Sequence, residues 1–261
     1  MSARLTAPRW SVVIPAYNEA ARLPRYLHEV AAYFDGRGEP YEVLVIDDGS
    51  GDGTADRVRE LAAAYPALSV HSLPRNRGKG HAVRAGMLRA RGDRRLMADA
   101  DGATPIVEVK RLETAIQAGA DVAVGSRALR DPSVAVIARP HRRLAGALFH
   151  VVSRAAGIAD VVDTQCGFKL FRGAVAVDLF AALVTEGFGF DVELLLLARR
   201  RGYRVAEVPV SWADQSGSKV RVFTDGPRML AQVVAARVRL ARAARSRARG
   251  RTPRPAPGSR P

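Results

Sequence analysis

Short apolar runs alternate with amphipathic stretches along the first half of the chain. Runs rich in Val, Ile and Leu predict buried strands, and apolar residues spaced three or four apart between them predict helices. The predicted strands cover residues 10–15, 41–46, 68–73 and 121–125 and a run ending at residue 98; the predicted helices cover 19–34, 54–65, 80–91 and 105–119, the first capped by Asn18. Strict alternation with short loops favours a parallel, doubly wound α/β sheet with right-handed crossovers.

Three polar loops follow the ends of predicted strands, at residues 47–54, 75–80 and 99–104. In a parallel sheet such ends meet at one rim, where open α/β folds bind ligands. The Gly- and Asp-rich composition of these loops favours a nucleotide site there. No G-x-G-x-x-G motif follows the first strand and no Walker lysine motif occurs, which excludes the dinucleotide-binding and P-loop versions of such a site.

Two carboxylates one residue apart, Asp99 and Asp101, stand at the end of the run that closes at Ala98. Mg²⁺ and Mn²⁺ prefer oxygen ligands, and Mg²⁺ usually takes one or two carboxylates and fills its other positions with phosphate and water. The motif therefore indicates a divalent metal held against a diphosphate. The alternative interpretation is a surface turn, since Asp and Gly are favoured in turns.

Positive charge is concentrated at the C-terminal end of the chain. The formal net charge is +15, but no acidic residue follows Asp225 and about ten arginines follow Gly226. A basic segment of this kind attracts nucleic acid or an anionic membrane surface. No aromatic residues lie between the arginines, and no helix-turn-helix or RNP pattern accompanies them. We therefore expect no specific nucleic-acid partner.

The length of 261 residues suits one sizeable α/β domain with an appendage. The single cysteine, Cys166, excludes an internal disulfide and is consistent with a reducing cytoplasm. The N-terminus has no long apolar run, and no stretch of about 18 uncharged apolar residues occurs anywhere, so we expect neither a signal peptide nor a spanning helix.

Four motifs carry a resemblance to a known family by their order and spacing: PAYNE (15–19), DDGS (47–50) with DGT (52–54), NRGKG (76–80) and DAD (99–101). Together they resemble the family 2 glycosyltransferases of the GT-A fold. Five further motifs are most similar to the dolichyl-phosphate β-glucosyltransferases, with the polyprenyl-phosphate mannosyltransferases as close relatives: MADADGATP (97–105), VGSR (124–127), DTQCGFKLF (163–171), FDVELL (190–195) and GSK (217–219).

The resemblance covers roughly residues 9–235 and implies a GT-A catalytic domain over residues 1–235. The remainder, 236–261, is rich in Arg and Pro, and we expect it to be a disordered basic tail. Helical periodicity nevertheless predicts a C-terminal helix from Gly226 to Arg245 at the junction.

The resemblance implies a nucleotide-sugar donor whose base is bound by the first two polar loops. Pro15, Tyr17 and Glu19 would line the nucleoside pocket, with Tyr17 on the base. Asp48, with Asp47 beside it, would accept the N3–H that uracil offers. The alternative for both carboxylates is turn and helix-cap duty.

The same resemblance implies how the diphosphate is held. Gly78 would let the backbone pass close to the nucleotide, and Lys79 would place a point charge beside it. Asp101 would be the chief ligand of Mg²⁺ or Mn²⁺, with Asp99 supporting it and touching the ribose.

The acceptor that the resemblance implies is a dolichyl or polyprenyl phosphate. Such a phosphate is already anionic and attacks without losing a proton, so an inverting transfer needs no general base. It does need cations that hold the acceptor beside the metal-bound diphosphate. Arg127 and Lys219 match family positions with this role, so we expect them, with Asp101, to be catalytic. Solvated surface charge is the alternative for both cations.

Four further acidic and amide residues match the family motifs: Asp163, Gln165, Asp191 and Glu193. Asp191 and Glu193 open a predicted helix, where negative charge is stabilising. We expect a structural or metal-site-ordering role for them, because the acceptor needs no base. Asp163 and Gln165 have no firm chemical role, and Cys166 is expected to be a small buried residue.

The expected activity is transfer of glucose from UDP-glucose to the lipid phosphate at the cytoplasmic face of a membrane. The alternatives are GDP-mannose as the donor, a soluble acceptor on the same fold, and nucleotide binding without catalysis. An apolar face within residues 139–158 and the arginines beyond Arg237 would attach the protein to anionic lipid. The alternatives for 139–158 are a core-packing helix and a docking site for a separate membrane-embedded partner.

Overall fold

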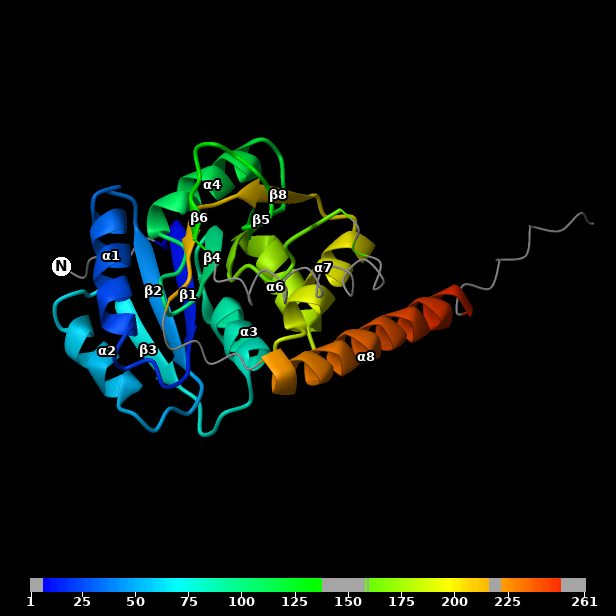
Figure 1. Ribbon diagram of the computed structural model, residues 1–261, viewed down its shortest axis with the longest axis horizontal. Helices are drawn as coiled ribbons and strands as arrows, with labels where there is room; N and C mark the ends of the chain where they lie inside the picture. The colour runs from blue at the N-terminus through cyan, green and yellow to red at the C-terminus, as the bar shows by residue number, and fades with distance from the viewer. Residues whose placement is uncertain (1–6, 138–157, 159, 216–221, 250–261) are drawn as a thin grey trace, which may run out of the picture.

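Seven strands form the central sheet in a computed structural model that describes residues 7–137, 158, 160–215 and 222–249 (Figure 1). They are β1 (Trp10–Ala16), β2 (Tyr41–Asp47), β3 (Leu68–Ser72), β4 (Arg94–Ala98), β5 (Val122–Ser126), β7 (Phe168–Arg172) and β8 (Val205–Pro209). Their order is β3–β2–β1–β4–β7–β5–β8, and every neighbouring pair is parallel except those of β7. A separate parallel pair joins β6 (Val136–Ile137) to β9 (Trp212–Ala213). The predicted mostly parallel α/β sheet is confirmed.

Helices cover both faces of this sheet, as a doubly wound fold requires. One face carries α1 (Leu23–Asp35), α2 (Thr54–Ala62) and α4 (Val109–Gln117), the last preceded by a 3-10 turn at Ile106–Glu108. The other face carries α3 (Lys79–Arg89), α6 (Gly173–Ala182), α7 (Phe190–Arg200) and α8 (Val222–Arg249).

The alternation of side chains along each strand divides the core into two clusters. In β1, Val12 and Ile14 join the cluster under α1, whereas Val13 joins the cluster under α3. In β7, Phe168 and Leu170 point to the first cluster, so the intervening Lys169 points to the α7 side. All of these side chains are buried. A strand covered on both faces reads as a continuous apolar run, which is why periodicity located β1 and β5 well.

The first helix begins later than the sequence predicts, and Asn18 does not cap it. Asn18 has a φ of 53°, its side-chain oxygen accepts a hydrogen bond from the Gly51 N–H at 3.0 Å, and its own N–H donates to Ser50 Oγ at 2.8 Å. Asn18 therefore ties the β1–α1 connection to the loop after β2. Helix α1 starts at Leu23 with Pro24 in its first turn, where the missing N–H costs nothing.

The C-terminal helix is longer than predicted at both ends. Helix α8 runs from Val222 to Arg249 and so includes residues 236–249, for which disorder is wrong. Residues 236–249 hold Ala, Leu and Arg, which are strong helix formers, and the Pro-rich composition begins only later. The rest of the predicted tail, 250–261, lies outside the described residues.

Two predicted features lie wholly or almost wholly outside the described residues. Lys219 is one, and the amphipathic segment 139–158 is the other; of that segment only Ile158 is described, and it is buried. Within the part of the chain that the structure describes, no helix has the combination of length and apolar character needed to cross a bilayer.

Candidate active site

Polar side chains from five strands meet at one edge of the sheet. Strands β1, β2, β4 and β5 run in the same direction, so the residues that follow Ala16, Asp47, Ala98 and Ser126 reach the same edge. Strand β7 runs the opposite way between β4 and β5, and the residues that precede Phe168 therefore arrive at that edge as well. This antiparallel strand places the segment 163–167 (DTQCG) beside the Asp99-Ala100-Asp101 motif.

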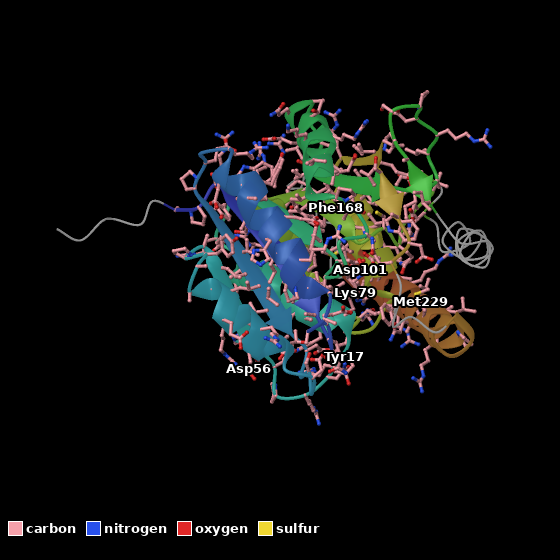
Figure 2. The ribbon with its side chains drawn as sticks, turned by 60° about the vertical axis from the view of Figure 1, so that its left-hand side comes forward. Tyr17, Asp56, Lys79, Asp101, Phe168 and Met229 are labelled. Carbon is pink, nitrogen blue, oxygen red and sulfur yellow. The ribbon has the colours of Figure 1, made fainter. Side chains whose placement is uncertain are left out.

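The two carboxylates of that motif have different partners. Asp99 forms an ion pair with the Lys79 ammonium at 2.6 Å. Asp101 accepts a hydrogen bond from the Ala103 N–H at 3.1 Å. Burial raises the pKa of Asp101, and the negative charge of Asp99 raises it further. Lys79 and Asp101 also lie close together in Figure 2, in agreement with the mutual effect of their charges.

Lys79 is the positive charge on which these carboxylates converge. Burial alone would lower the pKa of this ammonium, but the carboxylates of Asp99, Asp191 and Asp101 outweigh burial, and the net pKa is raised. Lys79 is therefore protonated at neutral pH. It stands at the first residue of α3, where the free N–H groups of the helix also favour an anion.

Asp47 and Asp48 organise the loops around this point. The Asp48 carboxylate accepts hydrogen bonds from the N–H groups of Gly78, at 2.7 Å, and of Arg77, at 3.1 and 3.2 Å. Asp47 accepts a hydrogen bond from the Ser50 N–H at 3.1 Å. This contact corresponds to the turn role that the sequence offered as the alternative for this carboxylate. Burial raises the pKa of Asp48 although the two N–H groups lower it. Asp48 thus holds the glycine–lysine loop in place beside the Asp99-Ala100-Asp101 motif, which we call the metal motif after the role predicted from the sequence.

Gly78 is required by its surroundings. Its φ is +108°, and a Cβ atom there would lie 2.7 Å from the backbone oxygen of Glu186. The His81 N–H donates to that same oxygen at 3.0 Å. A side chain at position 78 would therefore push the start of α3 away from the 184–189 segment.

The three residues predicted to line a nucleoside pocket have separate environments. Tyr17 is 40% exposed and presents its ring to solvent. Pro15 is buried within β1, so it shapes the strand that leads to Tyr17. The Glu19 carboxylate binds the Arg22 guanidinium through Nε at 2.8 Å and Nη2 at 2.6 Å. The positive charge of Arg22 in turn acts on Asp101, so Glu19 contributes to the metal motif indirectly.

Arg127 is held by an acidic partner that the sequence left without a role. Its Nε and Nη2 donate to the two oxygens of Asp163 at 2.7 and 2.8 Å, and its backbone N–H donates to Asp163 at 2.9 Å. Its guanidinium also lies over the Trp212 ring, 5.4 Å from the centroid. Glu207 accepts the backbone N–H groups of Val162 and Asp163, each at 2.8 Å, and so fixes the position of that carboxylate.

Both members of this pair are charged. Burial opposes ionisation of each, but the Arg127 guanidinium lowers the pKa of Asp163 and Asp163 raises the pKa of Arg127. The negative charge of Asp99 also contributes to the raised pKa of Arg127, which places this guanidinium within electrostatic range of the metal motif.

The segment between Asp163 and Lys169 lies against Asp99 and Arg127. A Cβ atom on Gly167 would lie 1.9 Å from Asp99 Oδ2, so only glycine lets the Asp99 carboxylate occupy its position. Cys166 is buried, as predicted, and its backbone oxygen accepts a hydrogen bond from Lys169 Nζ at 2.7 Å. Gln165 has a buried Nε2 atom that finds no hydrogen-bond partner among the described residues. A ligand oxygen could satisfy that donor.

Lys169 and Asp191 form a buried ion pair behind the metal motif. The Lys169 side chain is 0% exposed and donates to Asp191 at the start of α7. Burial raises the pKa of Asp191, and the charges of Lys169 and Lys79 lower it. Charges thus alternate from Lys169 through Asp191 and Lys79 to Asp99. The predicted ordering role of Asp191 agrees with this arrangement.

Glu193 joins α7 to α8 rather than to the metal motif. Its carboxylate accepts the Thr185 N–H at 2.8 Å and pairs with Arg239 of α8 at 2.6 Å. Gln232 of α8 accepts the Gly189 N–H at 2.9 Å. These contacts fix the 184–189 segment, which in turn touches Gly78 at the start of α3.

Two positions that contact the site residues, Gly167 and Lys169, were not predicted from the sequence. A usable signal existed for Lys169: lysine occurs only at positions 79, 110, 169 and 219 in a chain that otherwise uses arginine. A buried strand position held by one of these rare lysines points to a specific charge partner. Gly167 gives no comparable signal, because its role depends on the pairing of β7 with β4.

Comparisons with known proteins agree with this geometry. A sequence profile of Glycosyl transferase family 2 matches residues 11–179. A dolichyl-phosphate β-glucosyltransferase of Trichomonas vaginalis is 40% identical over 220 residues, which is 80% of this chain and 65% of that protein. The corresponding proteins of Saccharomyces cerevisiae and Homo sapiens are each 38% identical, over 87% and 82% of this chain and 74% and 70% of their own lengths.

Solved structures confirm the fold. Glucosyl-3-phosphoglycerate synthase from Mycobacterium tuberculosis, in complex with Mn²⁺ and UDP-glucose, superposes with a TM-score of 0.64 at 22% identity, over 88% of this chain and 77% of that one. Mannosyl-3-phosphoglycerate synthase from Rubrobacter xylanophilus also gives a TM-score of 0.64, at 20% identity, over 97% and 79% of the two chains. By the extent of the profile match and its identity to the yeast protein, the chain belongs to glycosyl transferase family 2.

Proposed function

We propose that the chain transfers glucose from UDP-glucose to a dolichyl or polyprenyl phosphate, with inversion at the anomeric carbon. The observation that carries this proposal is the identity of 38–40% to dolichyl-phosphate β-glucosyltransferases over 80–87% of the chain. The chain spans 65–74% of the length of these relatives.

The described residues fit a divalent metal. Asp99 and Asp101 offer hard oxygen ligands, and Asp101 has its pKa raised by burial and by the neighbouring carboxylate, which a cation would relieve. No group of three or more His, Cys, Asp or Glu side chains suited to a metal occurs among the described residues, so two carboxylates are what this part of the chain supplies. A bound Mg²⁺ or Mn²⁺ would neutralise the charge that develops on the nucleoside diphosphate as it leaves.

The remaining residues orient the two substrates. Tyr17 presents an exposed ring on which the base can stack, and Asp48, by accepting the Gly78 N–H, holds the loop whose Lys79 ammonium would bind the phosphates. Lys79 also keeps Asp99 in position through their ion pair. A direct hydrogen bond from the base to Asp47 or Asp48 is part of the proposal.

Arg127 would bind the acceptor phosphate with the part of its guanidinium that Asp163 leaves available. Nε and Nη2 of Arg127 donate hydrogen bonds to Asp163, and Nη1 has no acceptor among the described residues. Asp163 therefore aims the guanidinium, and Lys219 would add a second positive charge. Since a phosphate ester needs no deprotonation to attack, Asp191 and Glu193 keep their structural tasks.

The second candidate is transfer to a soluble phosphorylated acceptor. The fold shared with glucosyl-3-phosphoglycerate synthase at a TM-score of 0.64 favours it. For the lipid acceptor, the enzyme must work at a bilayer surface, on the cytoplasmic face, either through its own surface or through a separate membrane-embedded partner.

A panel of donors and acceptors tests the proposal. Purified protein is incubated with Mg²⁺ or Mn²⁺, labelled UDP-glucose or GDP-mannose, and either a short polyprenyl phosphate or 3-phosphoglycerate. We expect chloroform-extractable label with UDP-glucose and the lipid phosphate. Extractable label with GDP-mannose and not with UDP-glucose would mean that the donor is GDP-mannose. Label transferred to 3-phosphoglycerate, which stays in the aqueous phase, would mean that the acceptor is soluble.

A further inference from the structure

Helix α8 has apolar side chains on two opposite sides. On its inner side, Val233 and Ala236 are buried, and Val233 packs in the cluster under α7. On its outer side, Leu230, Val234 and Val238 are 45%, 54% and 43% exposed. Their spacing of four residues places these three side chains in one row along the helix. We call Leu230, Val234 and Val238, with the exposed Ala231 and Ala241 between and after them, the outer row.

An apolar outer row is the reverse of what a surface helix normally presents. A helix at the surface of a globular protein turns its charged residues outward. The other exposed large apolar side chains of the described residues lie on several different parts of the chain: Tyr17, Leu88, Val107, Ile137, Val162, Val177 and Val184. Contiguous exposed apolar residues rimmed by polar ones mark an interaction surface.

The charges at the edges of the outer row identify what it contacts. Arg237 lies on one side of the row and Arg228 and Arg242 on the other, and all three are exposed. No acidic residue occurs after Asp225, so nothing on this part of the helix repels an anionic surface. Apolar side chains flanked by arginines suit a helix that lies in the headgroup region of a bilayer. Each arginine near anionic lipid contributes about 1 kcal/mol.

We infer that the outer row of α8 is a membrane-binding surface that inserts into the interface of an anionic bilayer. The inference deepens the proposed function, on whose lipid acceptor its purpose rests. It also assigns membrane attachment to a part of the chain other than residues 139–158.

The inner side of α8 connects this surface to the active site. Gln232 and Arg239 bind the segment after α6 and Glu193 of α7, and that segment touches the start of α3 beside Lys79. Helix α8 packs against α7, and its C-terminal end projects beyond it (Figure 1). A bilayer in contact with the outer row would therefore lie at a fixed position relative to the donor site.

Vesicle binding tests the inference without the acceptor. Co-sedimentation is measured with vesicles of phosphatidylglycerol and phosphatidylcholine that contain no polyprenyl phosphate, and no nucleotide is added. The triple variant Leu230→Gln/Val234→Gln/Val238→Gln should bind about ten-fold more weakly than the unaltered chain. Its fold should persist, since these side chains are exposed. The matched control Val107→Gln/Val177→Gln removes two equally exposed valines elsewhere and should bind like the unaltered chain.

A fluorescent label reports insertion directly. The only cysteine, Cys166, is buried, so Val234→Cys and the control Val177→Cys each create a single accessible thiol. An environment-sensitive dye on position 234 should shift to shorter wavelength when vesicles are added, and a dye on position 177 should not. Arg228→Gln/Arg242→Gln should weaken binding only to vesicles that contain phosphatidylglycerol and should reduce its salt dependence.

Two results would overturn the inference. One is equal vesicle binding by the triple variant and the unaltered chain. The other is a dimer of the unaltered chain that the triple variant dissociates, with vesicle binding unchanged, which would make a second copy of the chain the occupant of the outer row. Both readings are independent of the donor and acceptor panel, so failure here and failure of the proposed activity are distinguishable.

Discussion

The candidate site can be divided into a first half, which contains the carboxylates at the ends of β2 and β4, and a second half, which contains those of the segment before β7 and of α7. The two halves hold their carboxylates in different ways. In the first half, Asp47 and Asp101 accept hydrogen bonds from backbone N–H groups of their own loops, and Asp48 accepts them from the neighbouring 77–78 loop. In the second half, the acidic side chains pair with cations from distant elements: Asp163 with Arg127, Asp191 with Lys169 and Glu193 with Arg239. The ion pair between Lys79 and Asp99 belongs to the first half and lies where the two halves meet.

This difference has a chemical consequence. A carboxylate that accepts backbone N–H groups keeps its negative charge for a ligand, which suits a site for metal and nucleotide. A carboxylate paired with a guanidinium or an ammonium fixes the position of that cation and cancels much of its charge. The first half therefore offers negative charge to a ligand, and the second half fixes the positions of cations.

The largest expected effect breaks the first half. Replacing Asp101 by Asn keeps the shape of the side chain and removes the negative charge of the proposed metal ligand. We expect turnover to fall about 10³-fold, or about 4 kcal/mol, because Lewis-acid stabilisation of the leaving group is worth several kcal/mol. Steady-state kinetics at saturating Mg²⁺ and Mn²⁺ measure it, with Asp56→Asn on the exposed side of α2 as the control. Unchanged turnover of Asp101→Asn would remove the metal site from the proposal.

The next effect concerns the buried pair of the second half. Lys169→Met removes a cation from Asp191 and leaves a buried carboxylate without its partner. The free energy of unfolding should fall by about 3 kcal/mol or more, whereas Lys169→Met/Asp191→Leu should recover much of that loss. Urea unfolding of the single and double variants measures both. A single variant as stable as the unaltered chain would show that the pair contributes no order to the site.

The same difference explains which parts of the site the sequence revealed. The motifs that hold Asp48, Gly78, Lys79, Asp99 and Asp101 are continuous short segments at or after strand ends, and the sequence predicted that they converge at one edge of the sheet, where the structure has them. The partner of Arg127 lies 36 residues away and that of Lys169 lies 22 residues away. No local pattern encodes those pairings, because they depend on the insertion of β7 between β4 and β5.

The fold shows a similar division. Buried strands such as β1 and β5 were recognisable, since they are apolar on both faces. Strand β7 was not among the predicted strands, and its direction has no sequence signal, because an antiparallel strand covered on both faces has the same apolar composition as a parallel one. The length of α8 was underestimated because its arginines were assigned to a disordered tail, although arginine is a good helix former.

A glycine at the junction of the two halves gives a third prediction. Gly167→Ala places a methyl group where Asp99 now lies, so the Asp99 carboxylate cannot keep the position in which it pairs with Lys79. We expect turnover to fall about 10²-fold, because a shift of about 1 Å in a catalytic group has effects of that size. Gly51→Ala is the matched control, since a Cβ there meets nothing within 4 Å. Equal activity of both variants would mean that the position of Asp99 is not critical.

Removing the positioned cation gives a fourth, smaller effect. Arg127→Ala should reduce transfer to lipid phosphate by about 2 kcal/mol, which is the range of a hydrogen bond to a charged group. Arg130→Ala, exposed and three residues further along, is the control. Nucleotide affinity, measured by calorimetry, should change much less than turnover. If nucleotide affinity and turnover fall by the same factor, Arg127 belongs to the first half of the site, which binds the donor. Lys219→Ala should behave in the same way as Arg127→Ala.

The smallest effect uses pH to separate the two ways of holding a carboxylate. Burial raises the pKa of Asp163, but Arg127 and its hydrogen bonds lower it by more, so the folded-state pKa is below the ordinary value of about 3.9. Its stabilising contribution is therefore complete above pH of about 4 and is lost as the pH falls through the folded-state pKa. Asp48 has the opposite sign, because burial raises its pKa and favours the protonated form in the folded state. The contribution of Asp48 to stability therefore increases as the pH falls through its folded-state pKa.

Urea unfolding between pH 7 and pH 3 of the unaltered chain, Asp163→Asn and Asp48→Asn measures these contributions. The stability advantage of the unaltered chain over Asp163→Asn should shrink toward low pH. The free energy of unfolding of the unaltered chain, relative to that of Asp48→Asn, should increase over the same interval. The two substituted carboxylates lie at the same edge of the sheet. The general loss of stability in acid is therefore the same for both variants. Parallel changes in the two variants would mean that a guanidinium partner and backbone N–H groups hold these carboxylates in equivalent ways, contrary to the contrast between the two halves.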